Sequence, residues 1–455
     1  MLKNKDKLSL LGSIWSCACG CLHEVPTKLA LIEPGAAGRS GEVARFLNLT
    51  GRALIIADEI TWEIAGHDVD RALKGAGYPT RSFLLPGAKP AATDLTAALA
   101  SAEVMEGDAF IVSVGSGTVT DISKCAASKQ GIPHIAVASA PSMNGYASGI
   151  AALTVAGLKM TVQANPPLAV VGDVDILARA PSAMIRAGLG DLVSKPVANA
   201  DWKLSSIING ERFCPRPFEL VQGIDAGDIA KRLAHDEACR AELGWNRDGI
   251  SLLMEALILS GVSMVIAGSS APASGGEHLI SHFMDMRAEV EGVRHDLHGA
   301  QVGVATVATA KLYEKLMSIP AESIDPRALS SAWERGDLMA KRIGDIFGER
   351  SGIILAEFAK KRGLRAENEE RIFRLVKGWD SIRMQLSPFL VSSARIRAAL
   401  DLAGAPVHYE EIGQGKAAFE EALVLSLAIR SRFTVLDVAL AFGELESWAD
   451  EIVGA

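Results

Sequence analysis

Four of the nine histidines in this 455-residue chain lie within 21 positions of one another. His278 and His282 are four residues apart in GGEHLISHF, which puts both rings on one face of a helix, about one turn apart. His295 and His298 follow in HDLHG. Imidazoles paired in this way can bind one metal ion, or a metal ion and a substrate, although capped or core-packed histidines would give the same pattern.

A carboxylate that could complete such a site is Asp191, which follows a glycine turn in GLGDLVSK at an expected helix start. A divalent ion held by one carboxylate and two imidazoles keeps a coordination position open for a substrate oxygen. It acts as a Lewis acid on a carbonyl, and it stabilises the charge that develops on the oxygen during hydride addition. The residue types therefore suggest metal-assisted redox chemistry.

A second chemical signal is the glycine turn in VSVGSGTVTD, where Gly115, Ser116 and Gly117 lie between an expected strand and an expected helix. Small residues let a phosphate approach closely, and the first amides of the helix can donate to it. The turn lacks the full G-x-G-x-x-G pattern. Asp58 ends an earlier strand, where a carboxylate could accept hydrogen bonds from ribose hydroxyls and favour NAD over NADP. Alternatively, Asp58 caps a helix beginning near Thr61.

These residues need a scaffold, and the first 180 residues predict one. Short apolar strands alternate with helical patterns, which favours a parallel sheet with helices on both faces. We expect strands at 52–58, 81–87, 108–117 and 134–140, with two more around a Pro-Pro turn in 159–177. After about residue 180, long segments with a 3.6-residue period replace the strands. The prediction is an α/β, Rossmann-like dinucleotide-binding domain over 1–180 and an all-α metal- and substrate-binding domain over 181–455.

Composition excludes several classes of protein. The net charge is −8 and no basic stripe is present, which argues against a nucleic-acid partner. No stretch reaches the ~18 continuous apolar residues of a membrane span, so we expect no membrane partner. The cysteines are not spaced like a disulfide framework, which favours the reducing cytoplasm.

Three of the six cysteines lie together in CACGCLH, where Cys17, Cys19, Cys21 and His23 could hold zinc. The C-x-C-x-C-x-H spacing is tighter than the usual C-x-x-C pair, and no second pair follows. The simpler interpretation is a small patch of thiols. The other three cysteines stand alone: Cys125, Cys214 and Cys239.

Four blocks of the chain resemble one known family. GSGTVTD, GLGDLVSKPVANADWKL, AGSSAPASGGEHLISH and LHGAQVGVATV are similar to segments of sn-glycerol-1-phosphate dehydrogenases. That family belongs to the superfamily of iron-dependent alcohol dehydrogenases, glycerol dehydrogenases and dehydroquinate synthases. The resemblance implies a dehydroquinate synthase-like fold, NAD(P) as cofactor, and reduction of dihydroxyacetone phosphate, or a close polyol phosphate ketone, to sn-glycerol 1-phosphate. It also implies a homo-oligomer.

The resemblance assigns roles to individual positions. Asp191, His278 and His298 would bind one divalent metal ion, zinc or nickel, with iron as a further candidate. Asp191 would also contact the substrate, as would His282, and these two would be the catalytic residues. The dinucleotide would be lined by the glycine turn and by nearby polar residues: Asp58, Gly115, Ser116, Gly117, Thr118, Asp121, Ser139, Ser142 and Ser148.

Two positions depart from the family pattern. The family usually reads S-x-D-G-x-x-S where this chain reads SMNGYAS, so that Asn144 replaces an aspartate that contacts substrate. An amide is neutral, and it donates as well as accepts hydrogen bonds. Pro196 replaces a common tyrosine, so the helix after Asp191 could start or kink differently. Lys195 and Lys203 could offer charge to a phosphate, although surface lysines are the simpler interpretation.

Two other functions stay open at this point. One is a carbon–oxygen lyase that uses NAD transiently, as dehydroquinate synthases do. The other is a non-catalytic protein that binds a dinucleotide or a phosphosugar, which the replacement at Asn144 would suit.

Overall fold

The computed structural model describes residues 4–87, 89–234, 244–325, 329 and 331–454, so Cys239 lies outside the described residues. The contacts divide the chain into two compact units. The first comprises Met1–Leu192 and Pro215–Ser270, and the second comprises Val193–Cys214 and Ala271–Ala455.

The first unit is built on a six-stranded sheet in the order β3-β10-β7-β6-β4-β5, in which every neighbouring pair is parallel. The strands are β3 (Leu29–Glu33), β4 (Arg52–Ala57), β5 (Thr80–Leu84), β6 (Asp108–Gly115), β7 (His134–Ala138) and β10 (Ala169–Asp173). The parallel sheet predicted from the sequence is confirmed. The edge strand β3, whose residues are all half-buried, was not predicted from the sequence.

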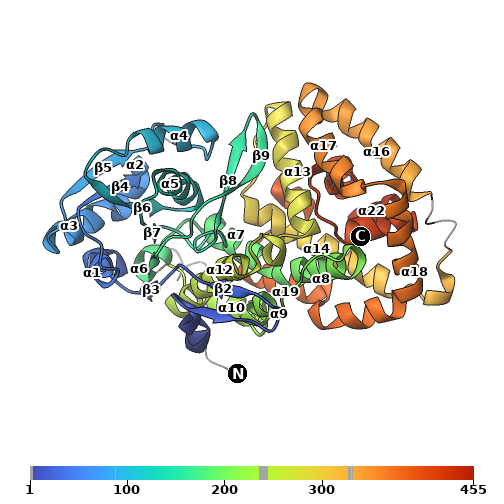
Figure 1. Cartoon of the computed structure of the whole chain (residues 1–455), viewed down its shortest axis with the longest axis horizontal. Coiled ribbons are helices and arrows are strands. Elements are labelled where there is room, and N and C mark those ends of the chain that lie inside the picture. Colours follow the sequence, from blue (N-terminus) through green and yellow to red (C-terminus); the bar gives the residue numbers. More distant parts are fainter. Residues whose placement is uncertain (1–3, 88, 235–243, 326–328, 330, 455) are drawn as a thin grey trace. The chain divides into compact units, whose positions relative to one another are not determined.

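Helices cover both faces of this sheet (Figure 1). In β4, Ala53 and Ile55 face a core shared with α1 (Ser40–Phe46) and α3 (His67–Gly75), whereas Leu54 and Ile56 face the opposite core. Successive side chains of a strand point to opposite faces, so a sheet buried on both faces needs apolar residues at every position. The opposite core is closed by α4 (Asp94–Ala102) and α5 (Gly117–Gln130).

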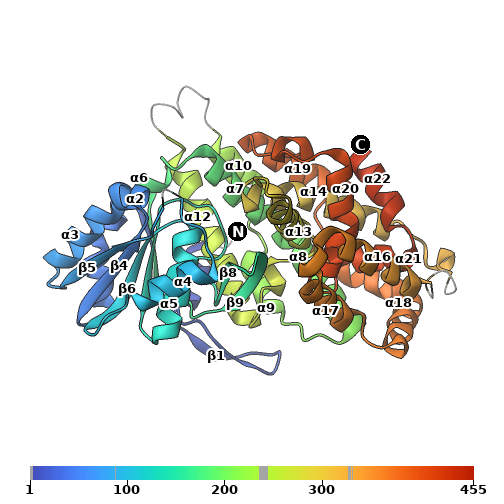
Figure 2. The same ribbon diagram turned by 90° about the horizontal axis from the view of Figure 1, so that it is seen from above.

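The Pro-Pro segment connects two different sheets. β9 (Leu158–Gln163) pairs antiparallel with β8 (Ile150–Val155) in a separate hairpin, whereas β10 joins the main sheet. The two expected strands therefore exist, but Pro166 and Pro167 do not turn one back onto the other. Proline has no N–H to donate to a ladder, which suits a connection that leaves one sheet before entering the next. Figure 2 shows β8 and β9 beside α4 and α5.

The first unit also takes in helices that the sequence analysis assigned to the all-α domain. They are α7 (Ser182–Val193) up to Leu192, α9 (Pro215–Val221), α10 (Ala226–Leu233) and α12 (Arg247–Ala267), whereas α6 (Val174–Leu177) lies within the predicted first domain. The reason is α12, which packs against β3 and β10 and thereby extends the sheet's core past residue 180.

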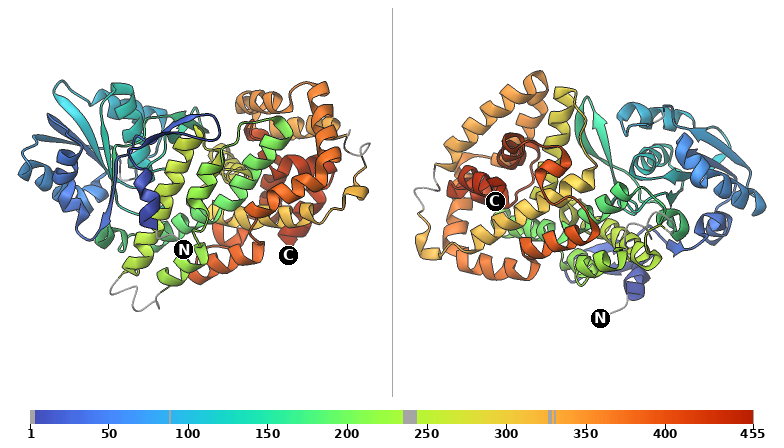
Figure 3. Two further views of the ribbon diagram at one scale, coloured as in Figure 1. Left: turned by 60° about the horizontal axis from the view of Figure 1, so that its bottom comes forward. Right: turned by 180° about the vertical axis from the view of Figure 1, so that it is seen from behind.

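α12 is also long and apolar enough to cross a membrane, by length and composition alone. Its most apolar window has a mean hydropathy of 2.1, and 72% of that window is buried within the structure. Such burial is typical of a core helix. The N-terminal segment, with a short antiparallel hairpin of β1 (Ile14–Ser16) and β2 (Leu22–Glu24), lies against α12 (Figure 3).

The second unit is helical throughout its described residues, as the sequence predicted. Its helices are α8 (Lys195–Asn209), α13 (Gly276–Glu291), α14 (His298–Met317), α16 (Ala332–Phe347), α17 (Ser351–Arg362), α18 (Arg365–Leu386), α19 (Ser393–Ala403), α20 (Lys416–Leu425), α21 (Val435–Phe442) and α22 (Leu445–Gly454). Its core includes α13 and α14, which pack against each other along the histidine-bearing segment.

Candidate functional site

The glycine turn lies where the sequence placed it, between β6 and α5. Ser116 is the N-cap of α5, but its side chain makes no capping hydrogen bond. The first amides of this 14-residue helix are therefore not capped by Ser116, and they lie at the positive end of the helix dipole. Such an end is a ready site for an anion. Thr118 lies in this first turn of the helix and is half-buried.

Close packing accounts for the two glycines. A Cβ at Gly115 would come within 2.5 Å of the Val119 Cβ, so the strand end approaches α5 closely. A Cβ at Gly117 would lie 3.0 Å from the Met143 sulfur, as would one at Gly145. The turn therefore lies against the segment that follows β7, which carries Ser139, Ser142, Asn144 and Ser148.

A buried lysine that the sequence analysis missed fixes this segment. Lys124 on α5 is fully buried, and its Nζ donates to the carbonyl of Gly145 at 2.8 Å and to Ser148 Oγ at 3.2 Å. Its ion-pair partner is Asp121, at 3.0 Å, whose other oxygen accepts from the Ala152 amide at 3.0 Å. Asp121 and Ser148, both expected near the dinucleotide, thus belong to a network that holds the segment in shape. The i,i+3 spacing of Asp121 and Lys124 on a helix of small residues was the available signal.

Two further contacts anchor the start of this segment. The Ser139 amide donates to the Gly115 carbonyl at 3.1 Å, which continues the pairing of β6 with β7. The Tyr146 hydroxyl donates to the Ala140 carbonyl at 2.7 Å, and burial raises the pKa of Tyr146 while a hydrogen bond with Ser142 opposes the shift. These contacts place Ser139 and Ser142 next to the glycine turn.

Asp58 is a helix cap in the structure. One carboxylate oxygen accepts from the Thr61 amide at 2.7 Å, and the Asp58 amide donates to Thr61 Oγ1 at 3.1 Å. This reciprocal capping box begins α2 (Glu59–Thr61). The capping interpretation is therefore confirmed, and a ribose contact by the same carboxylate stays a prediction.

Asn144, which departs from the family pattern, orients the carboxylate of Asp191. The carboxylate is buried on α7, where one oxygen accepts from the Asn144 amide at 2.8 Å and the other from Asn144 Nδ2 at 3.0 Å. Both donors come from one residue, so the carboxylate is held in a fixed plane. An aspartate at 144 would offer only the backbone donor and would place a second negative charge there.

The approach of α7 to this segment depends on Gly188. A Cβ at that position would lie 1.8 Å from the carbonyl oxygen of Pro141, which no rearrangement of side chains could relieve. Gly188 lies about one helical turn before Asp191, so it determines how closely the carboxylate can approach Asn144.

In the second unit, three of the four clustered histidines come together. The ring centroids are 5.1 Å apart for His278 and His298, 5.3 Å for His282 and His298, and 6.1 Å for His278 and His282. Ligand atoms of His278 and His298 lie within 4.8 Å of each other, and His282 is outside that close group. His295 lies apart on an exposed stretch, where it pairs with Asp285 at 3.0 Å.

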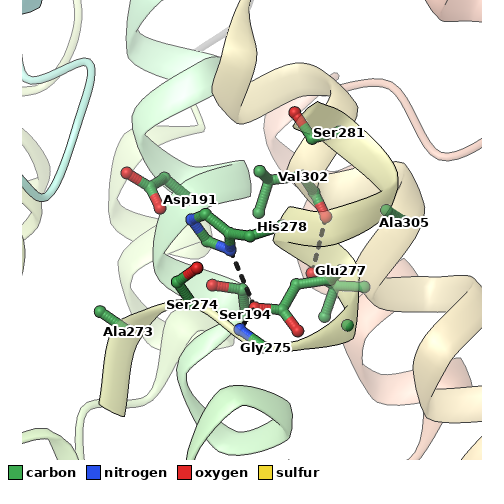
Figure 4. Close-up of polar contacts among 12 residues, drawn as sticks. Asp191, Ser194, Ala273, Ser274, Gly275, Glu277, His278, Ser281, Val302 and Ala305 are labelled. Carbon is green, nitrogen blue, oxygen red and sulfur yellow. Dashed lines mark hydrogen bonds and ion pairs between the residues drawn. The ribbon is translucent and has the colours of Figure 1, made fainter. Parts of the chain in front are cut away.

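Oxygen partners orient both rings of the close pair. Glu277 Oε1 lies 2.8 Å from His278 Nδ1, and Ser281 Oγ lies 3.1 Å from His298 Nδ1. Figure 4 shows Glu277 beside the His278 ring, with Ser281 further along the same helix. An imidazole that donates from Nδ1 presents the lone pair of Nε2, which is the arrangement found in metal-binding histidines. The donor set of the described residues thus fits a divalent ion.

A second buried acid, Asp201 on α8, contacts the start of the histidine-bearing helix α13. Its carboxylate accepts from the Tyr313 hydroxyl at 2.6 Å and from the amides of Gly276 and Val435, each at 2.7 Å. Burial, together with the charge of Glu277, raises the pKa of Asp201 to about 7. Asp201 therefore ties α13 to α8, α14 and α21. No local pattern indicated this role, because the partners of Asp201 are distant in the chain.

The two lysines considered for phosphate binding have other partners. Lys195 is buried, not on the surface as the simpler interpretation assumed, and its Nζ donates to the Ala273 carbonyl at 3.0 Å. Lys203 lies over the Phe213 ring, 5.1 Å from its centroid. Pro196 occupies the first turn of α8, where its missing N–H costs nothing.

Comparisons with known proteins agree with this architecture. Residues 31–181 match the family described as iron-containing alcohol dehydrogenase. The chain is 14% identical to the crystal structure of glycerol dehydrogenase from Schizosaccharomyces pombe, with a TM-score of 0.61 over 94% of this chain and 90% of that one. At that identity the likeness shows the fold alone.

Sequence relatives are more specific. The glycerol-1-phosphate dehydrogenase of Bacillus licheniformis is 34% identical over 73% of this chain and 84% of its own length. That of Thermococcus kodakarensis is 33% identical over 71% of this chain and 83% of its own length. Both are named as NAD(P)+ enzymes. With this identity over most of each relative, and with the sheet, the glycine turn and the paired histidines in place, the chain belongs to the glycerol-1-phosphate dehydrogenase family of the iron-containing alcohol dehydrogenases.

Proposed function

We propose that this protein is a metal-dependent, NAD(P)-linked dehydrogenase that reduces dihydroxyacetone phosphate, or a close polyol phosphate ketone, to sn-glycerol 1-phosphate. The observation that carries the proposal is the close pair of His278 and His298, each with an oxygen partner on Nδ1, in a chain of this family. The lyase alternative and the non-catalytic alternative have no observation of their own in their favour.

The metal ligands in this proposal are Asp191, His278 and His298, and the ion is zinc or nickel, with iron as a further candidate. Asp191 precedes Val193, the first residue of the second unit, by only two positions, so chain connectivity keeps the carboxylate near the border of the unit that carries the histidines. When bound, the ion supplies Lewis-acid polarisation of a substrate carbonyl. His282 would contact the substrate without being a third imidazole ligand.

The chain's own groups would do the remaining work. The first amides of α5 would bind the pyrophosphate of the dinucleotide, and Lys124 would hold the neighbouring segment in place through Gly145 and Ser148. Asn144 would keep the Asp191 carboxylate oriented. Asn144 would act on the substrate only through Asp191, because its backbone N–H and its side-chain Nδ2 both donate to that carboxylate.

We further propose that the protein works in the cytoplasm as a self-associating enzyme. The described cysteines Cys17, Cys19, Cys21, Cys125 and Cys214 are thiols, not disulfides, which suits a reducing compartment.

The test is a spectrophotometric assay with chain that has been stripped of metal and reloaded with Zn²⁺, Ni²⁺ or Fe²⁺. NADH and NADPH would each be followed with dihydroxyacetone phosphate, dihydroxyacetone and glyceraldehyde 3-phosphate. We expect stoichiometric oxidation of the reduced dinucleotide with dihydroxyacetone phosphate, and an enantiomer-specific assay should identify the product as the sn-1 phosphate.

Two results would contradict the proposal. Turnover without net change in dinucleotide would favour the lyase. Dinucleotide binding by calorimetry, without hydride transfer to any ketone by the metal-loaded protein, would favour a binding protein.

A further inference from the structure

The short hairpin at the N-terminus carries a group of soft side chains outside the dehydrogenase site. β1 and β2 are antiparallel, with Trp15 opposite His23 in the register and their rings 5.5 Å apart. The turn between the strands is closed by two hydrogen bonds, from the Cys17 amide to the Cys21 carbonyl at 2.8 Å and from the Gly20 amide to the Cys17 carbonyl at 2.9 Å. Gly20 has a φ of 84°, which permits this tight reversal.

The reversal gathers two thiols and an imidazole. Cys19 Sγ lies 3.3 Å from His23 Nε2, and the ligand atoms of Cys17, Cys19 and His23 all lie within 4.8 Å of one another. Zn–S bonds of about 2.3 Å and Zn–N bonds of 2.0–2.1 Å imply roughly 3.3–3.8 Å between neighbouring ligand atoms in a tetrahedral site. Only small side-chain movements separate the observed arrangement from that geometry. Cys21 lies outside the close group, although it belongs to the same turn.

The hairpin lies against a helix of the first unit. β2 packs on α12, and Lys7 Nζ ties the N-terminal segment to the end of α9 through the Leu220 carbonyl at 2.6 Å.

We propose that Cys17, Cys19 and His23 bind a zinc ion separate from that of the dehydrogenase site. Thiolate and imidazole ligands suit zinc and disfavour Mg²⁺ and Ca²⁺, which prefer oxygen. Two thiolates and one imidazole are three of the four ligands of a tetrahedral zinc site. Binding is an exchange: each thiol releases its proton to solvent as the Zn–S bond forms.

The ion would stabilise an element that has little support of its own. A two-stranded hairpin is at best marginally stable alone. The face opposite Trp15 and His23 carries Ile14 and Leu22, which are 60% and 71% exposed, so that face adds little burial. A bound ion would hold the turn of the hairpin closed.

Cobalt substitution tests the proposal without using enzyme activity. Co²⁺ bound to thiolates gives intense ligand-to-metal charge-transfer absorption in the near ultraviolet, which a site of one carboxylate and two imidazoles does not give. We expect metal-stripped wild-type protein to develop this absorption, and the variant His278→Ala/His298→Ala, which lacks the dehydrogenase site, to reach the end point at one Co²⁺ per chain. Cys21→Ser, the matched control from the same turn, should behave like wild type, whereas the double variant Cys17→Ser/Cys19→Ser should lose the absorption.

Zinc counting by mass spectrometry separates this proposal from the proposed function. The double variant His278→Ala/His298→Ala should lose the dehydrogenase ion and keep one zinc per chain. His23→Ala should bind the remaining zinc at least tenfold more weakly. The proposal would be overturned by a wild-type titration without thiolate absorption, by equal loss of absorption in Cys21→Ser, or by a histidine variant that retains no zinc. The wild-type titration decides even where a cysteine variant fails to fold.

Discussion

The glycine turn of the first unit and the histidine pair of the second are held in place by different means. The turn depends on backbone shape: Gly115 and Gly117 allow close packing, and the Ser116 side chain does not cap α5. The histidine pair depends on buried acids: Glu277 contacts the His278 ring, and Asp201 accepts from the Gly276 amide at the start of the same helix. A site for an anion is made by leaving amides uncapped, whereas a site for a cation is made by burying negative charge nearby.

We expect the largest effect on activity from the removal of one histidine of this pair. His298→Ala removes a proposed metal ligand, so kcat/KM and metal affinity should fall by more than the roughly 10- to 100-fold typical of losing an outer hydrogen-bond partner. Steady-state kinetics and metal-binding calorimetry would measure both quantities.

His295→Ala is the matched control for His298→Ala. His295 is three residues away, exposed, and paired with Asp285. Its variant should keep both constants within about twofold, since His295 lies outside the close group of ligand atoms. Similar losses in the two variants would remove the distinction between the clustered histidines and the exposed one.

The two units should also respond to pH in opposite directions. Burial lowers the pKa of His134, at the start of β7, to about 3, so this stabilisation is lost as pH falls below the unfolded value of about 6.5. Burial raises the pKa of Asp201 to about 7, so that contribution is present at low pH and is lost as pH rises from about 4 to 7. From pH 6.0 to 5.0, His134 should destabilise the first unit and Asp201 should stabilise the second, each by roughly 1 kcal/mol.

Hydrogen exchange with mass spectrometry across a urea series can follow the two units separately. The variants His134→Gln and Asp201→Asn isolate each contribution, because the difference in unfolding free energy between wild type and variant should change with pH in opposite senses. Ser113 Oγ, 2.8 Å from His134 Nε2, can still hydrogen-bond an amide. Parallel pH dependences in the two variants would contradict the assignment.

The smallest effect concerns the cap at Asp58. Asp58→Ala should lower the unfolding free energy by about 1 kcal/mol, the usual cost of losing an N-cap side chain. Thr61→Val removes only the reciprocal hydroxyl and should cost less. If Asp58 also binds ribose, its variant alone should raise the KM for NADH and improve the use of NADPH. If Asp58→Ala and Thr61→Val have equal KM values for NADH, the Asp58 carboxylate acts only as a helix cap.

The sequence predicted what depends on local pattern. Strands β4, β6 and β7 were visible as apolar runs, and the glycine turn and the i,i+4 histidines were visible as spacings. The edge strand β3 and the separate β8–β9 hairpin were not, because strand pairing is decided by partners far along the chain. The domain border at residue 180 was drawn where strands end, whereas α12 continues the sheet's core.

Within the candidate site, sequence reasoning found the groups that would touch ligands and missed the groups that hold them. Lys124, Glu277 and Asp201 act through buried contacts with the carbonyls, rings and amides of other segments. Nothing in their immediate sequence distinguishes them from ordinary helix residues. Asn144 was recognised as a departure, but its two hydrogen bonds to Asp191 became visible only in three dimensions.

The contact of α7 with Pro141 has a consequence for engineering this enzyme. Since even a methyl group at position 188 would overlap a main-chain oxygen at 1.8 Å, every substitution there must shift the helix. Libraries that aim to broaden substrate range should therefore vary the loop side chains and leave this glycine alone. At this position the tolerance for mutation is essentially zero, because the constraint comes from the main chain of a neighbouring segment.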